Sequence, residues 1–294
     1  MSFIEKVKRM FRGREDLSQR FVLLREAISG TMSEFYVARD RKTDQVVGLK
    51  ILDREKTLQF EGRFKGLQKP TEGEIASQLN HPRVVQTLEY GFSTEGQHYL
   101  VMELLEGPGL NSLILEQSKW LYRHRVTLVK QMAEAIGAVH KAGFIHRDVC
   151  ARNFICTPQA ESLKLIDFGL TVPAEKEYMQ PGNRTGTPNY MAPEIIRRRS
   201  TDHRVDLFAM GVTAYQVFTY ELPWPGGDNT GMAALMHDTR APVDIRERCS
   251  GIDPVLVKAI MDCLASDPND RPQTAEDFAD AIRHVHDENS TEAN

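Results

Sequence analysis

The sequence has no long apolar run and few cysteines, and both shortages limit what the protein can be. None of its apolar stretches reaches the roughly 18 residues that a membrane-spanning helix requires. Its four cysteines form no C-x-x-C pair, so free thiols in a reducing cytosol fit better than disulfides or zinc. The formal net charge is only -4, and no overall positive field attracts nucleic acid. We therefore predict a cytoplasmic protein with no nucleic-acid partner.

Residues 1–18 form a basic amphipathic segment that lacks the apolar stretch and cleavage site of a signal peptide. Its apolar residues recur at helical spacing, and they are Phe3, Ile4, Val7, Met10 and Phe11. The pattern suits a helix that docks on an anionic membrane or a partner, or a short helix packed on its own domain. We favour the second interpretation, because so short a periodic segment is weak for interfacial binding.

The first third of the chain has the pattern of strands and the rest has the pattern of helices. Short runs rich in Val, Leu, Phe and Tyr predict strands at 21–24, 34–39, 45–52 and 98–102. A helix is expected at 71–79, with Thr71 as its cap and Glu72 on its apolar face. Residues 207–218 are apolar nearly all round, which indicates a buried helix. A β-rich part followed by an α-rich part predicts an α+β fold with two lobes.

Two motifs in the helical part carry groups suited to phosphoryl transfer. An HRD motif at 146–148 is followed by Asn153, and a DFG motif stands at 167–169. Phosphoryl transfer needs metal ions on the phosphates and a group that orients the acceptor hydroxyl. The Asp167 carboxylate and the Asn153 amide oxygen are ligands that Mg²⁺ prefers. Asp148, kept off the metal, can accept the hydroxyl proton.

Lys50 ends the strand-like segment VVGLK, and Glu72 follows on the predicted helix. A lysine fixed by a glutamate can hold a phosphate oxygen as a point charge. Such a pair alone is usually a surface pair of little worth. Its position ahead of the HRD and DFG motifs is what gives it weight.

These motifs, in this order, resemble those of the eukaryotic-like (Hanks-type) protein kinase family. The matching segments are GTMSEFYVARD, VVGLK, NHPRVV, YLVMELLEG, HRDVCARN, LIDFG, GTPNYMAPE, VDLFAMGV and DPNDRP. The resemblance implies an α+β bilobal protein kinase fold, with a β-rich N-lobe that has one main helix, an α-helical C-lobe, and ATP between them. The kinase domain would span 19–286, divided into an N-lobe at 19–104 and a C-lobe at 105–286, with a disordered tail at 287–294.

The resemblance also implies the roles of individual residues. The catalytic residues would be Asp148, Lys50 and Arg152, and the Mg²⁺ ligands Asn153 and Asp167. The residues that contact or orient ATP would be Ile28, Gly30, Ser33, Phe35, Lys50, Glu72, Met102, Glu103, Leu105 and Ile155. Glu194 with Arg271, and Asp206 under the catalytic loop, would be structural.

The chain departs from the family pattern at three places. Ile28 and Ser33 replace two of the three glycines in the phosphate-covering loop. Cys150 stands where serine/threonine kinases carry lysine, and Arg152 matches the usual tyrosine-kinase pattern. An insertion-like segment at 60–70 separates the lysine from the glutamate. Because GTPNY at 186–190 resembles the serine/threonine form, we predict Ser/Thr acceptors, with Arg152 supplying the missing cation.

The first hypothesis is therefore a protein kinase that uses ATP and Mg²⁺ to phosphorylate protein substrates. Self-phosphorylation is expected at Thr185 or Thr171, with Thr187 unmodified and bonded near Asp148. A pseudokinase that binds ATP or acts as a scaffold is the alternative, motivated by the two missing glycines. A small-molecule phosphotransferase fits less well, because GTPNYMAPE resembles a protein-substrate platform. Arg197, Arg198 and Arg199 indicate a solvated helix end, or an acidic-substrate patch, and Trp224 indicates a rigid loop.

Overall fold

A computed structural model describes residues 14–29, 32–64, 66–182, 184–225 and 233–287. Within these ranges the chain divides into two units. Unit 1 comprises residues up to 80 together with 85–105, and unit 2 comprises 81–84 together with the residues after 105. Most of the predicted basic segment (1–13), Gly30 and most of the predicted tail (288–294) lie outside the described residues. Over the described residues, no helix has both the length and the apolar character needed to cross a membrane.

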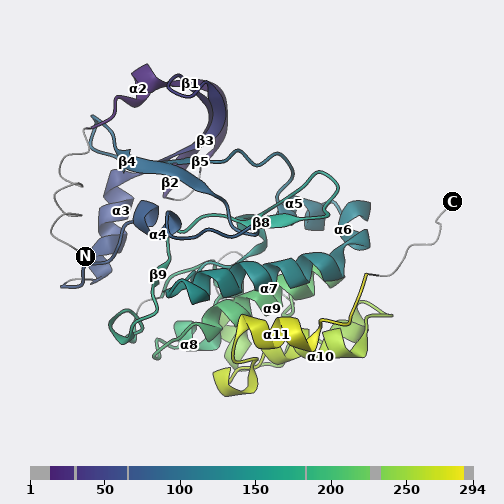
Figure 1. Ribbon diagram of the computed structural model, residues 1–294. Coiled ribbons are helices and arrows are strands. Elements are labelled where there is room, and N and C mark those ends of the chain that lie inside the picture. The colour runs from purple at the N-terminus through teal and green to yellow at the C-terminus, as the bar shows by residue number, and fades with distance from the viewer. Residues whose placement is uncertain (1–13, 30–31, 65, 183, 226–232, 288–294) are drawn as a thin grey trace. The chain divides into compact units, whose positions relative to one another are not determined.

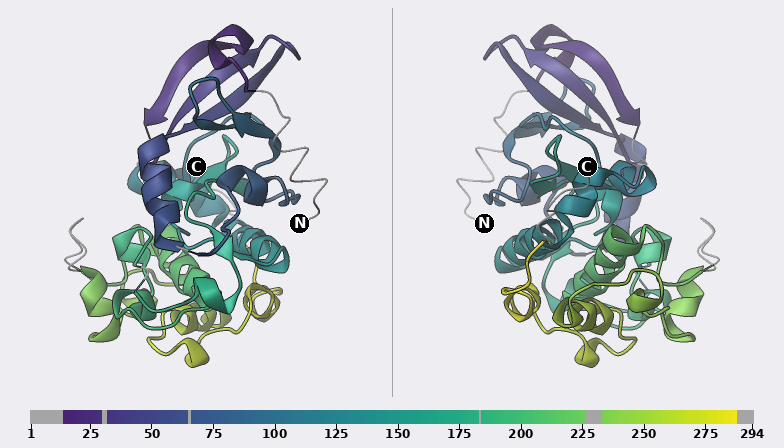
Figure 2. Two further views of the ribbon diagram at one scale, coloured as in Figure 1. Left: turned by 90° about the vertical axis from the view of Figure 1, so that its left-hand side faces the viewer. Right: turned by 90° about the vertical axis from the view of Figure 1, so that its right-hand side faces the viewer.

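Unit 1 is built on a twisted five-stranded antiparallel sheet (Figures 1 and 2). The strand order is β1-β2-β3-β5-β4, and the strands are β1 (Phe21–Ser29), β2 (Ser33–Asp40), β3 (Gln45–Leu52), β4 (Thr87–Phe92) and β5 (His98–Met102). One face packs a buried apolar cluster whose members are Phe21, Ala38, Val47, Leu49, Tyr99 and Val101. Because side chains alternate along a strand, Lys50 lies on the opposite face from Leu49. The four predicted strands are confirmed, and β4 is added to them.

The helices of unit 1 differ from the prediction of one main helix. They are α2 (Leu17–Arg20), α3 (Arg54–Glu61), the 3-10 helix η1 (Gly62–Phe64) and α4 (Glu72–Ala76). The insertion-like segment is thus partly helical, because Asp53 caps α3 and buried Phe60 packs edge-on against Phe64. Helix α4 ends at Ala76 and not at 79, because the side chains of Ser77 and Gln78 donate to the Glu74 carbonyl. The main-chain hydrogen bonds of residues 78 and 79 also change to the i to i+3 pattern of a 3-10 turn.

Unit 2 is mainly helical, and the predicted α+β class is confirmed. Its α-helices are α5 (Leu110–Leu115), α6 (Lys119–Arg123), α7 (Arg125–Lys141), α8 (Pro193–Ile196), α9 (Arg204–Thr219), α10 (Pro254–Cys263) and α11 (Ala275–Ala281). Its short strands pair β6 (Phe144–Ile145) with β9 (Val172–Pro173), and β7 (Phe154–Cys156) with β8 (Leu163–Leu165). Its 3-10 helices are η2 (Ala151–Asn153), η3 (Lys176–Tyr178), η4 (Pro188–Tyr190), η5 (Ala233–Asp238), η6 (Ile245–Glu247) and η7 (Pro268–Asp270).

Helix α9 is the buried centre of unit 2, as its apolar sequence predicted, and it contacts α7 and α10 (Figure 2). Helix α7 has no cap from its own N-cap residue, His124. Asp287 supplies the cap, since its carboxylate accepts the main-chain N–H groups of Val126 (2.7 Å) and Thr127 (3.1 Å). Asp287, the first residue of the predicted tail, is thus bonded to the start of α7.

Candidate active site

In unit 1, Lys50 and Glu72 form a buried ion pair. Lys50 Nζ lies 2.6 Å from Glu72 Oε1, and the two side chains are 8% and 7% exposed. Strand β3 carries the lysine, and the late start of α4 places the glutamate in its first turn. Thr71 fixes that start through a capping box with Glu74. The pair that motif order suggested is thus present in unit 1.

The same face of the sheet carries Phe35, Gly48 and Met102. The strand register opposes Phe35 to Lys50, and Gly48 to Met102. A Cβ on Gly48 would lie 2.9 Å from Cε2 and Cζ of Phe35, so the ring occupies the space of a side chain at residue 48. Where this chain has phenylalanine and glycine, the family motifs have valine and alanine. This fourth, compensating departure was missed in the sequence.

The other predicted nucleotide contacts of unit 1 lie at its strand ends. Ser33 begins β2, and Ile28 lies in β1, where only the main chain is described. Met102 ends β5, and Glu103 and Leu105 follow it in the chain. Glu103 N–H donates to the Gln86 carbonyl at 3.0 Å. In unit 2, Ile155 lies half-buried in β7.

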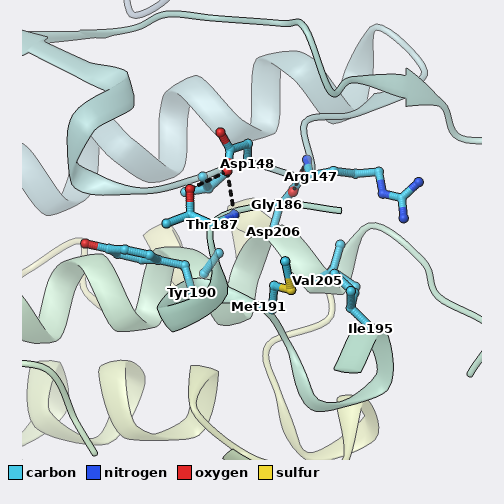
Figure 3. A pocket seen from close by; sticks show the side chains of 11 residues that line it. Arg147, Asp148, Gly186, Thr187, Tyr190, Met191, Ile195, Val205 and Asp206 are labelled. Atoms are coloured by element: carbon cyan, nitrogen blue, oxygen red, sulfur yellow. Dashed lines mark hydrogen bonds between the residues drawn. The ribbon is translucent and has the colours of Figure 1, made fainter. Parts of the chain in front are cut away.

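In unit 2, Asp148 is held by donors from two directions. Oδ1 accepts the N–H and the hydroxyl of Thr187, at 2.8 and 2.7 Å (Figure 3). Oδ2 accepts from Asn153 Nδ2 at 3.1 Å. Burial raises the pKa of Asp148, and the Thr187 hydroxyl opposes that rise by stabilising the carboxylate. A carboxyl group with a raised pKa is the stronger base once ionised, which suits proton acceptance.

The loop that carries Asp148 rests on Asp206, the fully buried carboxylate of α9. Asp206 accepts the N–H groups of His146 and Arg147, both at 2.8 Å, and bonds His140 Nε2 at 2.9 Å. Burial alone would raise the pKa of Asp206, but these partners together hold it below its ordinary value. Arg147 takes a positive φ of 67°, an uncommon conformation that clusters at functional sites. Asp206 braces the loop in the geometry that the resemblance implied.

The platform segment 186–191 lies directly against the catalytic loop. A Cβ on Gly186 would lie 2.7 Å from the Arg147 carbonyl, and Gly186 has a φ of 120°, so glycine is required there. Arg152 donates to the Thr187 hydroxyl at 3.1 Å. Arg152, Thr187 and Asp148 therefore form one hydrogen-bonded chain. Cys150 is buried beside it, and burial raises its pKa to about 11, so it is not a reactive thiolate.

The predicted metal ligands suit Mg²⁺ in their chemistry. Asn153 Nδ2 donates to the Asp148 carbonyl (2.7 Å) and carboxylate, so the amide oxygen is the atom available to a cation. Ile166 N–H donates to the Asn153 carbonyl at 2.8 Å, which ties the residue before Asp167 to Asn153. No cluster of three or more His, Cys, Asp or Glu ligands occurs among the described residues. Mg²⁺ needs none, because it is commonly held by one or two protein groups plus phosphates.

The two hydroxyls expected to be phosphorylated are both buried. Thr171 is 0% exposed and donates to the His146 carbonyl, and Thr185 is 6% exposed. Tyr178 is also buried, and Thr187 is engaged with Asp148. Neither Thr171 nor Thr185 is accessible in this structure, so phosphorylation of either hydroxyl would require this segment to change conformation.

Three other sequence features take structural roles. Glu194 and Arg271 form a bidentate pair with both distances 2.8 Å, as the resemblance implied. Trp224 is buried, which agrees with a rigid loop, and Arg197 pairs with Asp238. His140 and His237, which bond Asp206 and the Met191 carbonyl, were missed, because isolated histidines in a sequence carry no motif.

Comparison with known proteins agrees with this geometry. Residues 23–285 match the family model described as protein kinase domain. Serine/threonine-protein kinases pkn3 and pkn2 of Myxococcus xanthus are each 32% identical, over 87% and 92% of this chain and 48% and 33% of their own lengths. Serine/threonine-protein kinase PknB of Mycolicibacterium smegmatis is 29% identical over 95% of this chain and 45% of its own. The chain thus spans about half or less of these relatives, and it belongs to the protein kinase domain family.

Proposed function

We propose that the chain transfers the γ-phosphoryl group of ATP to serine or threonine hydroxyls of proteins. The observation that carries the proposal is the bonding of Asp148 to Thr187, which joins the expected base to the expected acceptor platform. The relatives named serine/threonine-protein kinases support the same acceptor class. A cytoplasmic location remains a prediction from the sequence.

Each charged group then has a defined task. Asp148 orients the acceptor hydroxyl and takes its proton. Arg152, bonded to Thr187, supplies a cation near the transferring group, and Lys50, fixed by Glu72, holds a phosphate oxygen. Bound Mg²⁺, held by Asn153 and Asp167, would neutralise phosphate charge. The remaining nucleotide contacts are proposed at Ile28, Gly30, Ser33, Phe35, Met102, Glu103, Leu105 and Ile155.

A pseudokinase is not favoured, because the chain retains every charged group that the reaction needs. The test is to incubate the purified chain with ATP, Mg²⁺ and myelin basic protein, and then map the phosphorylated residues. We expect phosphoserine and phosphothreonine, and none above background with Asp167→Ala, which controls for contaminating kinases. Absence of transfer would favour the pseudokinase, and predominant phosphotyrosine would overturn the acceptor class.

A further inference from the structure

The short helix η5 holds the segment that follows the platform at both ends. His237 Nδ1 lies 2.9 Å from the Met191 carbonyl oxygen. A carbonyl oxygen only accepts, so Nδ1 carries a proton and donates. The next residue, Asp238, pairs with Arg197 Nε at 2.6 Å. Helix η5 thus anchors the chain just before and just after α8.

His237 is itself held firmly in place. Its side chain is buried, and its ring centroid lies 4.2 Å from that of Trp224 and 5.5 Å from that of Phe208. Ser266 Oγ donates to the His237 carbonyl at 3.1 Å. Burial lowers the pKa of His237, because the charged ring would lose its hydration. The residue therefore presents a fixed neutral donor.

Met191 connects this donor to the chemistry. It ends the platform and lines a small pocket together with Asp148, Gly186 and Thr187 (Figure 3). Thr187 stands four residues before it and supplies both donors to Asp148 Oδ1. A shift of the Met191 main chain would therefore move the groups that define the acceptor position.

We propose that His237 is a positioning residue for the protein acceptor, because its Nδ1–H anchors the Met191 carbonyl and with it the platform 186–191. The inference rests on the proposed function and adds a residue that no motif contains. It also gives Arg197, the first arginine of the triplet, an ion-pair partner within the fold in Asp238.

Two substitutions separate the donor from the packing. His237→Phe keeps an aromatic ring beside Trp224 but removes the donor, and His237→Asn returns an N–H close to the place of Nδ1. With myelin basic protein as acceptor, we expect His237→Phe to raise the acceptor KM about tenfold, because positioning errors are costly in catalysis. The KM for ATP should stay unchanged. His237→Asn should recover part of the loss.

Ser266→Ala is the matched control, since it removes a bond to His237 without touching Met191. Hydrogen–deuterium exchange of the amides in 186–196 gives a readout that needs no activity. Exchange there should accelerate clearly more in His237→Phe than in Ser266→Ala. If the wild type phosphorylates nothing, the proposed function fails, but the exchange data still test whether His237 holds the Met191 carbonyl in place. Unchanged exchange in His237→Phe, or an equal rise in the KM for ATP, would overturn the inference.

Discussion

Units 1 and 2 hold their key charges by different means. In unit 1, a buried ion pair joins Lys50 of β3 to Glu72 of α4. In unit 2, neutral donors of Thr187 and Asn153 hold the Asp148 carboxylate. Removing one member of a buried pair leaves an uncompensated charge, whereas removing one neutral donor loses a single hydrogen bond. Substitutions at the ion pair should therefore reduce stability strongly, whereas substitutions of the donors around Asp148 should have smaller, graded effects.

The largest effect on catalysis is expected when Asp148 itself is replaced, because no neighbouring group can take over as the base. Asp148→Asn keeps the shape and removes the base, so kcat should fall by roughly 10² or more. Steady-state kinetics with ATP at saturation measure this. Near-normal kcat, with contaminating kinases excluded, would contradict the assignment of the base.

Breaking the ion pair should come next. Glu72→Gln removes the negative charge that lies 2.6 Å from the buried ammonium of Lys50, and it should lower the free energy of unfolding by about 3 kcal/mol. Phosphoryl transfer should fall with it. Urea unfolding measures the first effect, and exposed Glu55→Gln is the control. Equal stability of the two variants would contradict a stabilising role for the ion pair in unit 1.

A graded effect is expected when Thr187 loses its hydroxyl. That hydroxyl stabilises ionised Asp148 and lowers its pKa, so Thr187→Val should raise the pKa. The acidic limb of the kcat profile should then move to higher pH, because the base is protonated sooner as pH falls. Thr185→Val is the control, since its buried hydroxyl bonds no other group among the described residues. Coincident limbs in the Thr187→Val and wild-type proteins would argue against the network.

A smaller, coupled effect is expected at Phe35 and Gly48. Gly48→Ala should displace the Phe35 ring, and Phe35→Val should reduce the contact area with the adenine of ATP. Each substitution should weaken ATP binding by a few-fold. Together they should cost less than the sum, because valine makes room for the new methyl group. Calorimetric titration with ATP over the four proteins measures the coupling. Phe92→Val and Gly62→Ala serve as controls. A Cβ on Gly62 would meet nothing within 4 Å. Additive losses would mean that the two residues are independent.

No effect is expected from removing phosphate. The segment from Asp167 to Thr187 presents buried or engaged hydroxyls, so phosphatase-treated protein should start phosphorylating acceptor without a lag. Progress curves and intact mass test this together. A lag that ends as Thr185 gains phosphate would instead support activation by loop phosphorylation.

Much of the site was accessible from the sequence because its motifs occur in a fixed order. Lys50 with Glu72, Asp148 with Thr187, and Glu194 with Arg271 all pair as expected. The burial of Thr171 and Thr185 could not be predicted from the sequence in this way. A hydroxyl in a polar loop looks the same in sequence whether the fold covers it or leaves it open.

By itself, the sequence determined the α+β class, the central buried helix and the charged groups of the site, because periodicity and motif spacing are local properties of a chain. The tertiary structure alone decided that the Phe35 ring fills the space above Gly48, that Asp287 caps α7 and that His237 anchors Met191. The last two contacts join residues far apart in the chain, and at Gly48 the ring from a neighbouring strand fills the space that a side chain would occupy. Such pairings depend on the distances that folding creates, and no local pattern encodes them.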